Sequence, residues 1–127
     1  MHELALCEAV LSVAQQAADG REIVRVKVRV GQLQRVLPES WEMCWRMATM
    51  GSSAAESVSK LAEAPARIRC LSCGSEGAPR APLDCAACGG HAITILAGEE
   101  LVVEEVELRG GEVLRNPSLA AVAEETG

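Results

Sequence analysis

The sequence predicts an α+β fold, in which two helices cover a small mixed three-stranded sheet and a cysteine-rich module is inserted before the last strand. Three observations predict this architecture. Helical and strand periodicities alternate through the first half of the chain, two closely spaced cysteine pairs follow, and further strand patterns come after the second pair. A chain of 127 residues has room for one domain that carries one smaller module.

The first segment, residues 3–18, has the pattern of an amphipathic helix. Its apolar residues recur at intervals of three and four, namely Leu6, Val10, Val13, Ala14 and Ala17. Gly20 follows the last of them and ends the helix. We expect the apolar side of this helix to pack on the sheet.

Residues 23–31 alternate between valines and basic residues. The valines are Val24, Val26, Val28 and Val30, and the basic residues are Arg25, Lys27 and Arg29. A period of two and a high β-branched content predict a strand whose valine face lies in the core. We expect the basic face to be solvated rather than to form a binding patch.

A second helix is expected to start at Pro38, where the missing N–H is tolerated, and to end before Gly51. Two rows of residues at helical spacing could face the core: Trp41 with Trp45, and Cys44 with Met47 and Ala48. Packing against the valine strand is the simpler explanation of these rows. A site for a soft metal ion, built from Cys7, Cys44 and the methionines, is the alternative.

Three later segments have strand patterns. Residues 58–64 lead through Pro65 to the cysteine pairs, and residues 92–97 follow the pairs. Gly98 separates that strand from residues 101–108, which we expect to return to the first sheet.

These elements divide the chain into three parts. Residues 1–64 together with 99–109 are predicted to form the α+β domain, and residues 65–98 the cysteine-rich module. Residues 110–127 are predicted to be a flexible tail, in which a short helix is allowed after Asn116 and Pro117.

Four cysteines have the spacing of a structural zinc site. Cys70 and Cys73 form one C-x2-C pair, Cys85 and Cys88 form another, and eleven residues separate the pairs. Small glycine-rich turns suit a chain that wraps a metal, and they are supplied here by Gly74, Gly89 and Gly90. We therefore predict a zinc-ribbon-like module. Redox dithiols, disulfides and a rubredoxin-like iron site are the alternatives.

The predicted zinc is structural because four thiolates fill its tetrahedron and leave no position for a water molecule. The loop between the cysteine pairs has Leu83 as its only sizeable apolar residue, so the metal must hold the module together. His91 could hydrogen-bond a zinc thiolate from outside the ligand set, although an ordinary surface histidine is the simpler interpretation.

Composition argues against several classes of function. Twelve basic and eighteen acidic residues give a net charge of −6, and Phe and Tyr are absent, so we predict no nucleic-acid binding. No apolar run approaches the roughly 20 residues of a membrane helix, and Glu3 and Glu8 stand where an export signal would be basic and then apolar. We therefore expect a cytoplasmic protein without membrane contact. No paired nucleophile and base and no phosphate-binding loop is recognisable, so we predict no enzyme and no catalytic residues.

The first three residues could chelate a metal ion. His2 is too large to allow removal of Met1, so the terminal amine, the His2 amide nitrogen and the His2 imidazole can close chelate rings. The amide or carboxylate of Glu3 could complete a square. A planar, nitrogen-rich set is typical of Ni(II) and Cu(II), whereas a frayed terminus without metal is the alternative.

The order of these features resembles the HypA/HybF family of nickel-insertion accessory proteins for nickel–iron hydrogenase. The resemblance rests on the opening Met1, His2, Glu3 and Leu4, the helix and valine strand, the two cysteine pairs and the run Gly98 to Leu101, and it extends to about Leu108. Two positions depart from the family pattern: Ala86 stands where proline is frequent, and Ser59 where an apolar residue is usual.

The resemblance implies a metallochaperone. Nickel would be its cargo, held at the N-terminus by Met1, His2 and Glu3 in the α+β domain, and zinc would be structural on Cys70, Cys73, Cys85 and Cys88. It also implies delivery to the hydrogenase large subunit together with a partner GTPase, service to urease maturation factors in some members, and a monomeric or homodimeric state. A zinc-ribbon adaptor that binds protein or nucleic acid, with an inert N-terminus, is the rival function.

Overall fold

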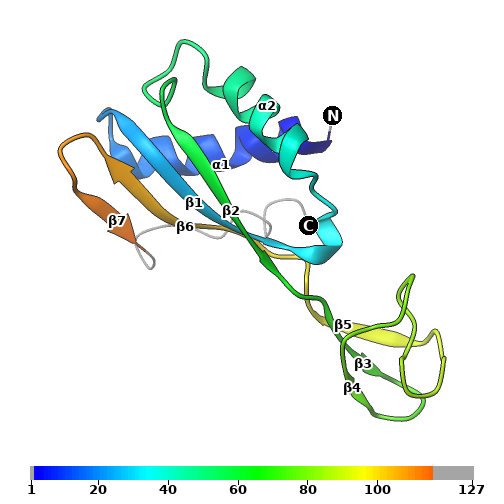
Figure 1. The fold of residues 1–127 in the computed structure, drawn as a ribbon. Helices are drawn as coiled ribbons and strands as arrows, with labels where there is room; N and C mark the ends of the chain where they lie inside the picture. The colour runs from blue at the N-terminus through cyan, green and yellow to red at the C-terminus, as the bar shows by residue number, and fades with distance from the viewer. Residues whose placement is uncertain (1, 116–127) are drawn as a thin grey trace.

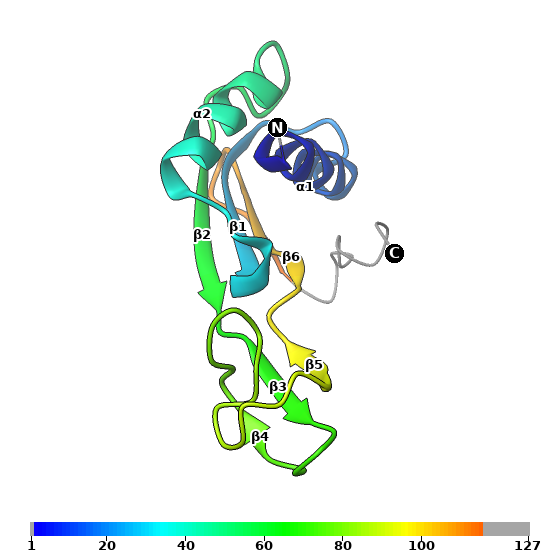
Figure 2. The ribbon, with the colours of Figure 1, turned by 90° about the vertical axis from the view of Figure 1, so that its right-hand side faces the viewer.

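The computed structural model describes residues 2–115 and shows an elongated molecule, with a helix-covered sheet at one end and a smaller sheet at the other (Figures 1 and 2). The elements are α1 (His2–Ala18), β1 (Ile23–Gly31), the 3-10 helix η1 (Gln32–Gln34), α2 (Pro38–Thr49), β2 (Val58–Ala64), β3 (Arg67–Cys70), β4 (Glu76–Gly77), β5 (Ile93–Ala97), β6 (Leu101–Leu108) and β7 (Val113–Arg115). The α+β prediction is confirmed. None of the described helices is long and apolar enough to cross a membrane.

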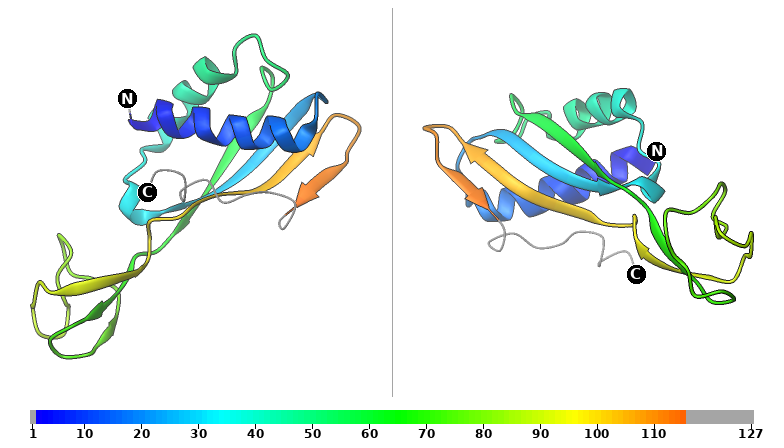
Figure 3. Two further views of the ribbon diagram at one scale, coloured as in Figure 1. Left: turned by 180° about the vertical axis from the view of Figure 1, so that it is seen from behind. Right: turned by 60° about the horizontal axis from the view of Figure 1, so that its bottom comes forward.

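The larger sheet has the strand order β2-β1-β6-β7. β1 and β2 are parallel and are connected through α2, whereas β6 returns from the small sheet to pair antiparallel with β1, as predicted. Both helices lie on one face of this sheet and contact each other (Figures 2 and 3). The strands β3, β4 and β5 form the second sheet, which extends away from the first.

The larger sheet has one strand more than the three that we predicted, because β7 pairs antiparallel with β6. The turn between them contains Gly110 and Gly111, both at positive φ, which is a frequent composition for a tight hairpin turn. The prediction of a flexible tail from residue 110 is therefore wrong for residues 113–115. The rest of that tail, with the short helix allowed in it, lies outside the described residues.

The core lies between the helices and the larger sheet, and the valine face of β1 contributes to it. Val26, Val28 and Val30 are buried as predicted, but Ile23 is buried in place of Val24. A shift in the register between β1 and β6, located between Ile23 and Arg25, breaks the alternation at this end of the strand. Sequence alternation alone does not reveal such a shift.

The two tryptophans of α2 are buried in the core, as predicted. Each indole N–H donates a hydrogen bond to a serine beside or within β2: Trp41 to Ser59 Oγ at 2.8 Å and Trp45 to Ser57 Oγ at 2.9 Å. This pairing gives the polar Ser59 a role, since a buried indole needs a hydrogen-bond acceptor.

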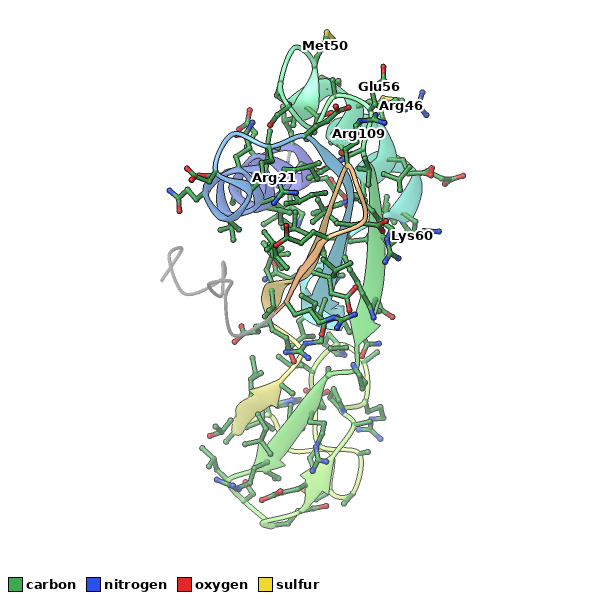
Figure 4. The ribbon with its side chains drawn as sticks, turned by 90° about the vertical axis from the view of Figure 1, so that its left-hand side faces the viewer. Arg21, Arg46, Met50, Glu56, Lys60 and Arg109 are labelled. Atoms are coloured by element: carbon green, nitrogen blue, oxygen red, sulfur yellow. The ribbon has the colours of Figure 1, made fainter. Side chains whose placement is uncertain are left out.

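The methionines of α2 are not core residues. The side chain of Met47 is 52% exposed, Met43 and Met50 are more exposed still, and Met50 points away from the molecule (Figure 4). The prediction that Met47 packs in the core is therefore wrong. Cys7 is fully buried, and burial raises the pKa of its thiol to about 12. The methionines and Cys7 do not share a site, and the soft-metal alternative loses its geometric basis.

The basic face of β1 is paired with acidic residues of the neighbouring strand β6. Arg25 Nε donates to Glu107 at 3.1 Å, and Arg29 Nη1 donates to Glu104 at 3.1 Å. The expected solvated face is thus a set of cross-strand ion pairs, each of which contributes roughly 0–1 kcal/mol at this degree of exposure.

Candidate metal centres

The four cysteines predicted as metal ligands lie together at one end of the small sheet. Cys70 ends β3, and the ligand atoms of Cys70, Cys73, Cys85 and Cys88 all lie within 4.8 Å of one another. The Sγ atoms of Cys70 and Cys88 are 3.6 Å apart, and those of Cys73 and Cys85 are 3.7 Å apart. A tetrahedral site with Zn–S bonds of about 2.3 Å requires sulfur separations of about 3.8 Å. The cluster therefore has the dimensions of a four-thiolate zinc site.

Main-chain N–H groups point at these sulfurs. The donors are Cys73 to Cys70 Sγ at 3.4 Å, Ala87 and Cys88 to Cys85 Sγ at 3.3 and 3.4 Å, and Gly90 to Cys88 Sγ at 3.4 Å. Gly74 and Gly89, one residue after each pair, have φ of 78° and 76°, in the left-handed region that glycine adopts most easily. The sequence therefore folds each pair into a turn that directs amides at its sulfurs.

The electrostatics of the cluster favour a cation. The main-chain N–H of Cys73 lowers the pKa of the Cys70 thiol to about 6, and that of Cys88 lowers the pKa of Cys85. The N–H of Gly90 acts on Cys88 in the same direction, but hydrogen bonds with the other three sulfurs outweigh it and raise the pKa of Cys88 to about 11. Four adjacent thiolates need a bound cation to be stable together. All six cysteines are free thiols, so the structure contains no disulfide in the cluster.

The imidazole of His91 makes its hydrogen bond with Asp84 and not with a cysteine sulfur. Its side chain is 84% exposed, and Nδ1 lies 2.7 Å from Oδ1 of Asp84. Sequence reasoning missed Asp84, which also pairs with Arg80 through two main-chain hydrogen bonds of 2.8 Å at the base of the second cysteine turn. His91 thus contacts the loop that carries Cys85 rather than a ligand atom.

The N-terminal candidate site lies at the start of α1. Met1 lies outside the described residues, and His2 is the first residue of the helix. Nε2 of His2 lies 2.7 Å from the main-chain oxygen of Gln34. A carbonyl oxygen only accepts hydrogen bonds, so Nε2 carries the proton, and in the neutral ring Nδ1 has the free lone pair. Nδ1 is the ring nitrogen that can close a six-membered chelate with the amide nitrogen of the same residue.

Glu3 contacts the same segment from the next position. Its Oε2 accepts a hydrogen bond from the main-chain N–H of Leu37 at 3.2 Å, and this bond lowers the pKa of the Glu3 carboxyl. The main-chain N–H groups at the start of a helix have no carbonyl four residues earlier to bind. The amides of His2 and Glu3 therefore have no role in the α-helical hydrogen-bond ladder.

The segment that contacts His2 and Glu3 follows β1 and includes η1. It is held against the two stretches by which the chain enters and leaves the small sheet. Where the chain enters, Ala66 N–H donates to Gln32 Oε1 at 2.9 Å; where it leaves, Leu33 N–H donates to Gly98 O at 2.8 Å and Gln34 Nε2 to Glu99 O at 2.7 Å. Any side chain at Gly31 would collide with the main chain of Gly98. Residues 32–37 have no periodic pattern, and no sequence signal indicated that they touch the N-terminus.

The fold and these donor sets define a two-part metal-binding protein, with a helix-covered sheet and a four-cysteine ribbon. The chain belongs to the HypA family, because the model of that family, described as a hydrogenase/urease nickel incorporation metallochaperone, matches residues 1–108. The predicted family is confirmed, as is the prediction that the protein is a metallochaperone rather than an enzyme.

Individual relatives agree with this assignment. The hydrogenase maturation factor HypA of Geobacter sulfurreducens is 34% identical over 109 residues, which cover 85% of this chain and 99% of the relative. The protein of the same description from a Nostoc species is 28% identical over 108 residues. Among solved structures, the solution structure of the nickel metallochaperone HypA from Helicobacter pylori matches with a TM-score of 0.63 at 18% identity, over 85% of this chain and 97% of that one. At that identity the likeness supports the fold.

Proposed function

We propose that this protein carries Ni(II) at its N-terminus and delivers it for the maturation of nickel–iron hydrogenase. Family membership supports the nickel cargo, and the hydrogen bond from His2 Nε2 to the Gln34 carbonyl is the structural observation that carries the location. This bond leaves Nδ1 as the metal donor, next to main-chain amides that the helix does not use.

The proposed nickel ligands are the Met1 amine, the His2 amide and Nδ1, and a donor from Glu3. The Glu3 donor would be its carboxylate, because the amine, Nδ1 and the Glu3 amide nitrogen would each have to lie beside the His2 amide nitrogen, and a planar site has only two such positions. That carboxylate accepts a hydrogen bond from Leu37 in the structure. A planar set of three nitrogens and one oxygen is nitrogen-rich, as Ni(II) prefers. Such a site is built from consecutive residues at a chain end, where an acceptor can approach it.

We further propose that Cys70, Cys73, Cys85 and Cys88 bind structural Zn²⁺. When bound, zinc would offset two of the four thiolate charges and cross-link the two cysteine turns of a small sheet whose core is minimal. The four sulfurs complete the tetrahedron, so the chain would hold zinc and nickel at separate sites with different donors.

The finer features of delivery stay predictions. They are transfer to the hydrogenase large subunit with a partner GTPase, service to urease maturation factors, a cytoplasmic location, a monomeric or homodimeric state, and no role for nucleic acid or membranes.

Calorimetry with nickel on untagged, zinc-loaded protein tests the proposal. We expect about one nickel per chain without loss of zinc. We expect His2→Ala, or an uncleaved N-terminal extension, to abolish this binding with the fold unchanged. His91→Ala is the matched control, because His91 is the only other histidine of the chain, and it should bind nickel normally. Equal nickel binding by the extended protein would exclude the amine as a ligand.

A further inference from the structure

We propose that Gln34 is a positioning residue for the nickel site. Its main-chain carbonyl fixes the His2 imidazole, and its side-chain amide holds that carbonyl in place by binding the main chain of Glu99. This inference rests on the proposed N-terminal nickel site and names the group that orients its imidazole.

The imidazole of His2 needs such a partner because it is exposed. An exposed histidine at the first position of a helix samples several rotamers, and few of them direct Nδ1 back toward its own amide nitrogen. The 2.7 Å hydrogen bond from Nε2 to the Gln34 oxygen selects one orientation and one tautomer. In metal sites, a carbonyl bound to the second ring nitrogen also makes the ligating nitrogen a better donor.

The position of this carbonyl is fixed from both sides of Gln34. Its own side-chain amide donates to Glu99 O at 2.7 Å, which ties it to the residues between β5 and β6. The next residue, Arg35, is in the left-handed region at φ 56°, and its N–H closes the turn onto Gln32 O at 3.2 Å. Leu37, three residues after Gln34, donates its main-chain N–H to the carboxylate of Glu3. The segment is therefore anchored to the connection between β5 and β6 at one end and to α1 at the other.

The side chain of Gln34 is the anchor that acts on the carbonyl most directly. Its amide hydrogen bond is made by a partly buried side chain outside the hydrophobic core, so its loss should not unfold the sheet. Without this hydrogen bond to Glu99, the Gln34 carbonyl that accepts the hydrogen bond from His2 is free to move with the turn. The expected consequence is weaker nickel binding through a less ordered imidazole, with zinc binding intact.

Two substitutions separate this role from a general effect on folding. Gln34→Ala removes the amide, and Gln34→Glu keeps its shape but places an acceptor against the Glu99 carbonyl, where a donor is required. Gln16→Ala is the matched control, because Gln16 is an exposed glutamine of α1 away from this segment. Zinc content and thermal midpoint should stay unchanged in all three variants.

The first measurement is heteronuclear NMR of the imidazole nitrogens in zinc-loaded protein before nickel is added, in a His91→Ala background so that only His2 contributes. In the parent we expect the Nε2–H tautomer, with an Nε2 proton that exchanges slowly with water. In both Gln34 variants that exchange should accelerate about fivefold, the equivalent of about 1 kcal/mol for one hydrogen bond. The Gln16 variant should match the parent.

The second measurement is the nickel dissociation constant, which should rise about fivefold in the Gln34 variants and stay constant in the control. Unchanged proton exchange in both Gln34 variants, or a proton on Nδ1 in the parent, would overturn the positioning role. A parent protein that shows the protected Nε2 proton but binds no nickel at its terminus would instead overturn the proposed function.

Discussion

The four-cysteine cluster and the first turn of α1 are the two proposed donor sets for metal ions, and they take their donors from different parts of the chain. The cluster uses side chains from two turns, and each turn directs its own amides at the sulfurs. The N-terminal set uses consecutive residues, and its orientation comes from a distant segment through Gln34 and Leu37. A closed set of thiolates suits a metal that stays, whereas a set at a chain end suits a metal that is handed on.

The largest difference in stability between the two regions should appear when one cysteine ligand of the cluster is replaced. Cys73→Ser should abolish zinc binding and unfold β3, β4 and β5, because structural zinc contributes about 10–16 kcal/mol to small modules. The helices and the larger sheet should remain folded, since their core contains none of the four ligands. Zinc content and hydrogen exchange measured by mass spectrometry report both effects. Cys44→Ser is the control and should retain zinc, and protection of the small sheet without zinc would contradict the prediction.

The stability of the helix-covered sheet should depend on apolar packing and not on zinc. Trp41 is almost completely buried in its core, so Trp41→Ala should lower the free energy of unfolding by about 3–5 kcal/mol. Zinc should still bind with a stoichiometry of one. Urea denaturation followed by circular dichroism, with zinc analysis on the same sample, measures both. Loss of zinc together with the sheet would show that the two parts are not independent.

Acid should separate the two metals. Nickel binding through the main-chain amide of His2 releases at least one proton, so its affinity should fall by at least a factor of about ten for each pH unit below neutral. In the cluster, main-chain N–H groups lower the pKa of Cys70 to about 6 and also lower that of Cys85, whereas hydrogen bonds with the other sulfurs raise the pKa of Cys88 to about 11. Zinc on four thiolates is held by a closed ligand set, so its release requires several ligands to be protonated together. Nickel should therefore leave before zinc when both are followed on one sample. Simultaneous release would argue against two separate sites.

The sequence predicted the long elements because their patterns are strong and local. The bounds of β1, β2 and β6 match the predicted segments, since each ends at glycine, alanine or a turn, and β1 and β6 are also rich in valine. β7 was missed because three residues are too few to show a period. The exchange of Val24 for Ile23 in the core depends on a register shift between strands. The exposure of Met47 depends on which side of α2 faces the sheet, and that side carries Trp41 and Trp45.

The candidate sites were also predictable to different degrees, because the sequence shows ligand side chains but not the contacts that the fold creates. Cysteine spacing identifies the four-thiolate cluster directly, because the ligands are side chains at fixed separations. His2 was predicted as a ligand from chelate chemistry and from the family resemblance, and its role stays a prediction. The contribution of Gln34 was not, because the group that contacts His2 is a main-chain carbonyl, which every residue has, and only the fold brings it to the N-terminus. Asp84 was missed in the same way, since its partner His91 is chosen by the loop geometry.

The smallest effect concerns a single hydrogen bond that anchors α2 to β2. Ser59→Ala leaves the buried indole N–H of Trp41 without its 2.8 Å partner, which should lower the free energy of unfolding by about 1 kcal/mol and leave both metal sites unchanged. A double-mutant cycle with Trp41→Phe isolates the bond, because phenylalanine has no N–H to satisfy. In the Trp41→Phe background, Ser59→Ala should cost almost nothing. An equal cost in both backgrounds would assign the effect of Ser59 to packing in β2 and would remove the hydrogen bond as the reason for a serine at this position.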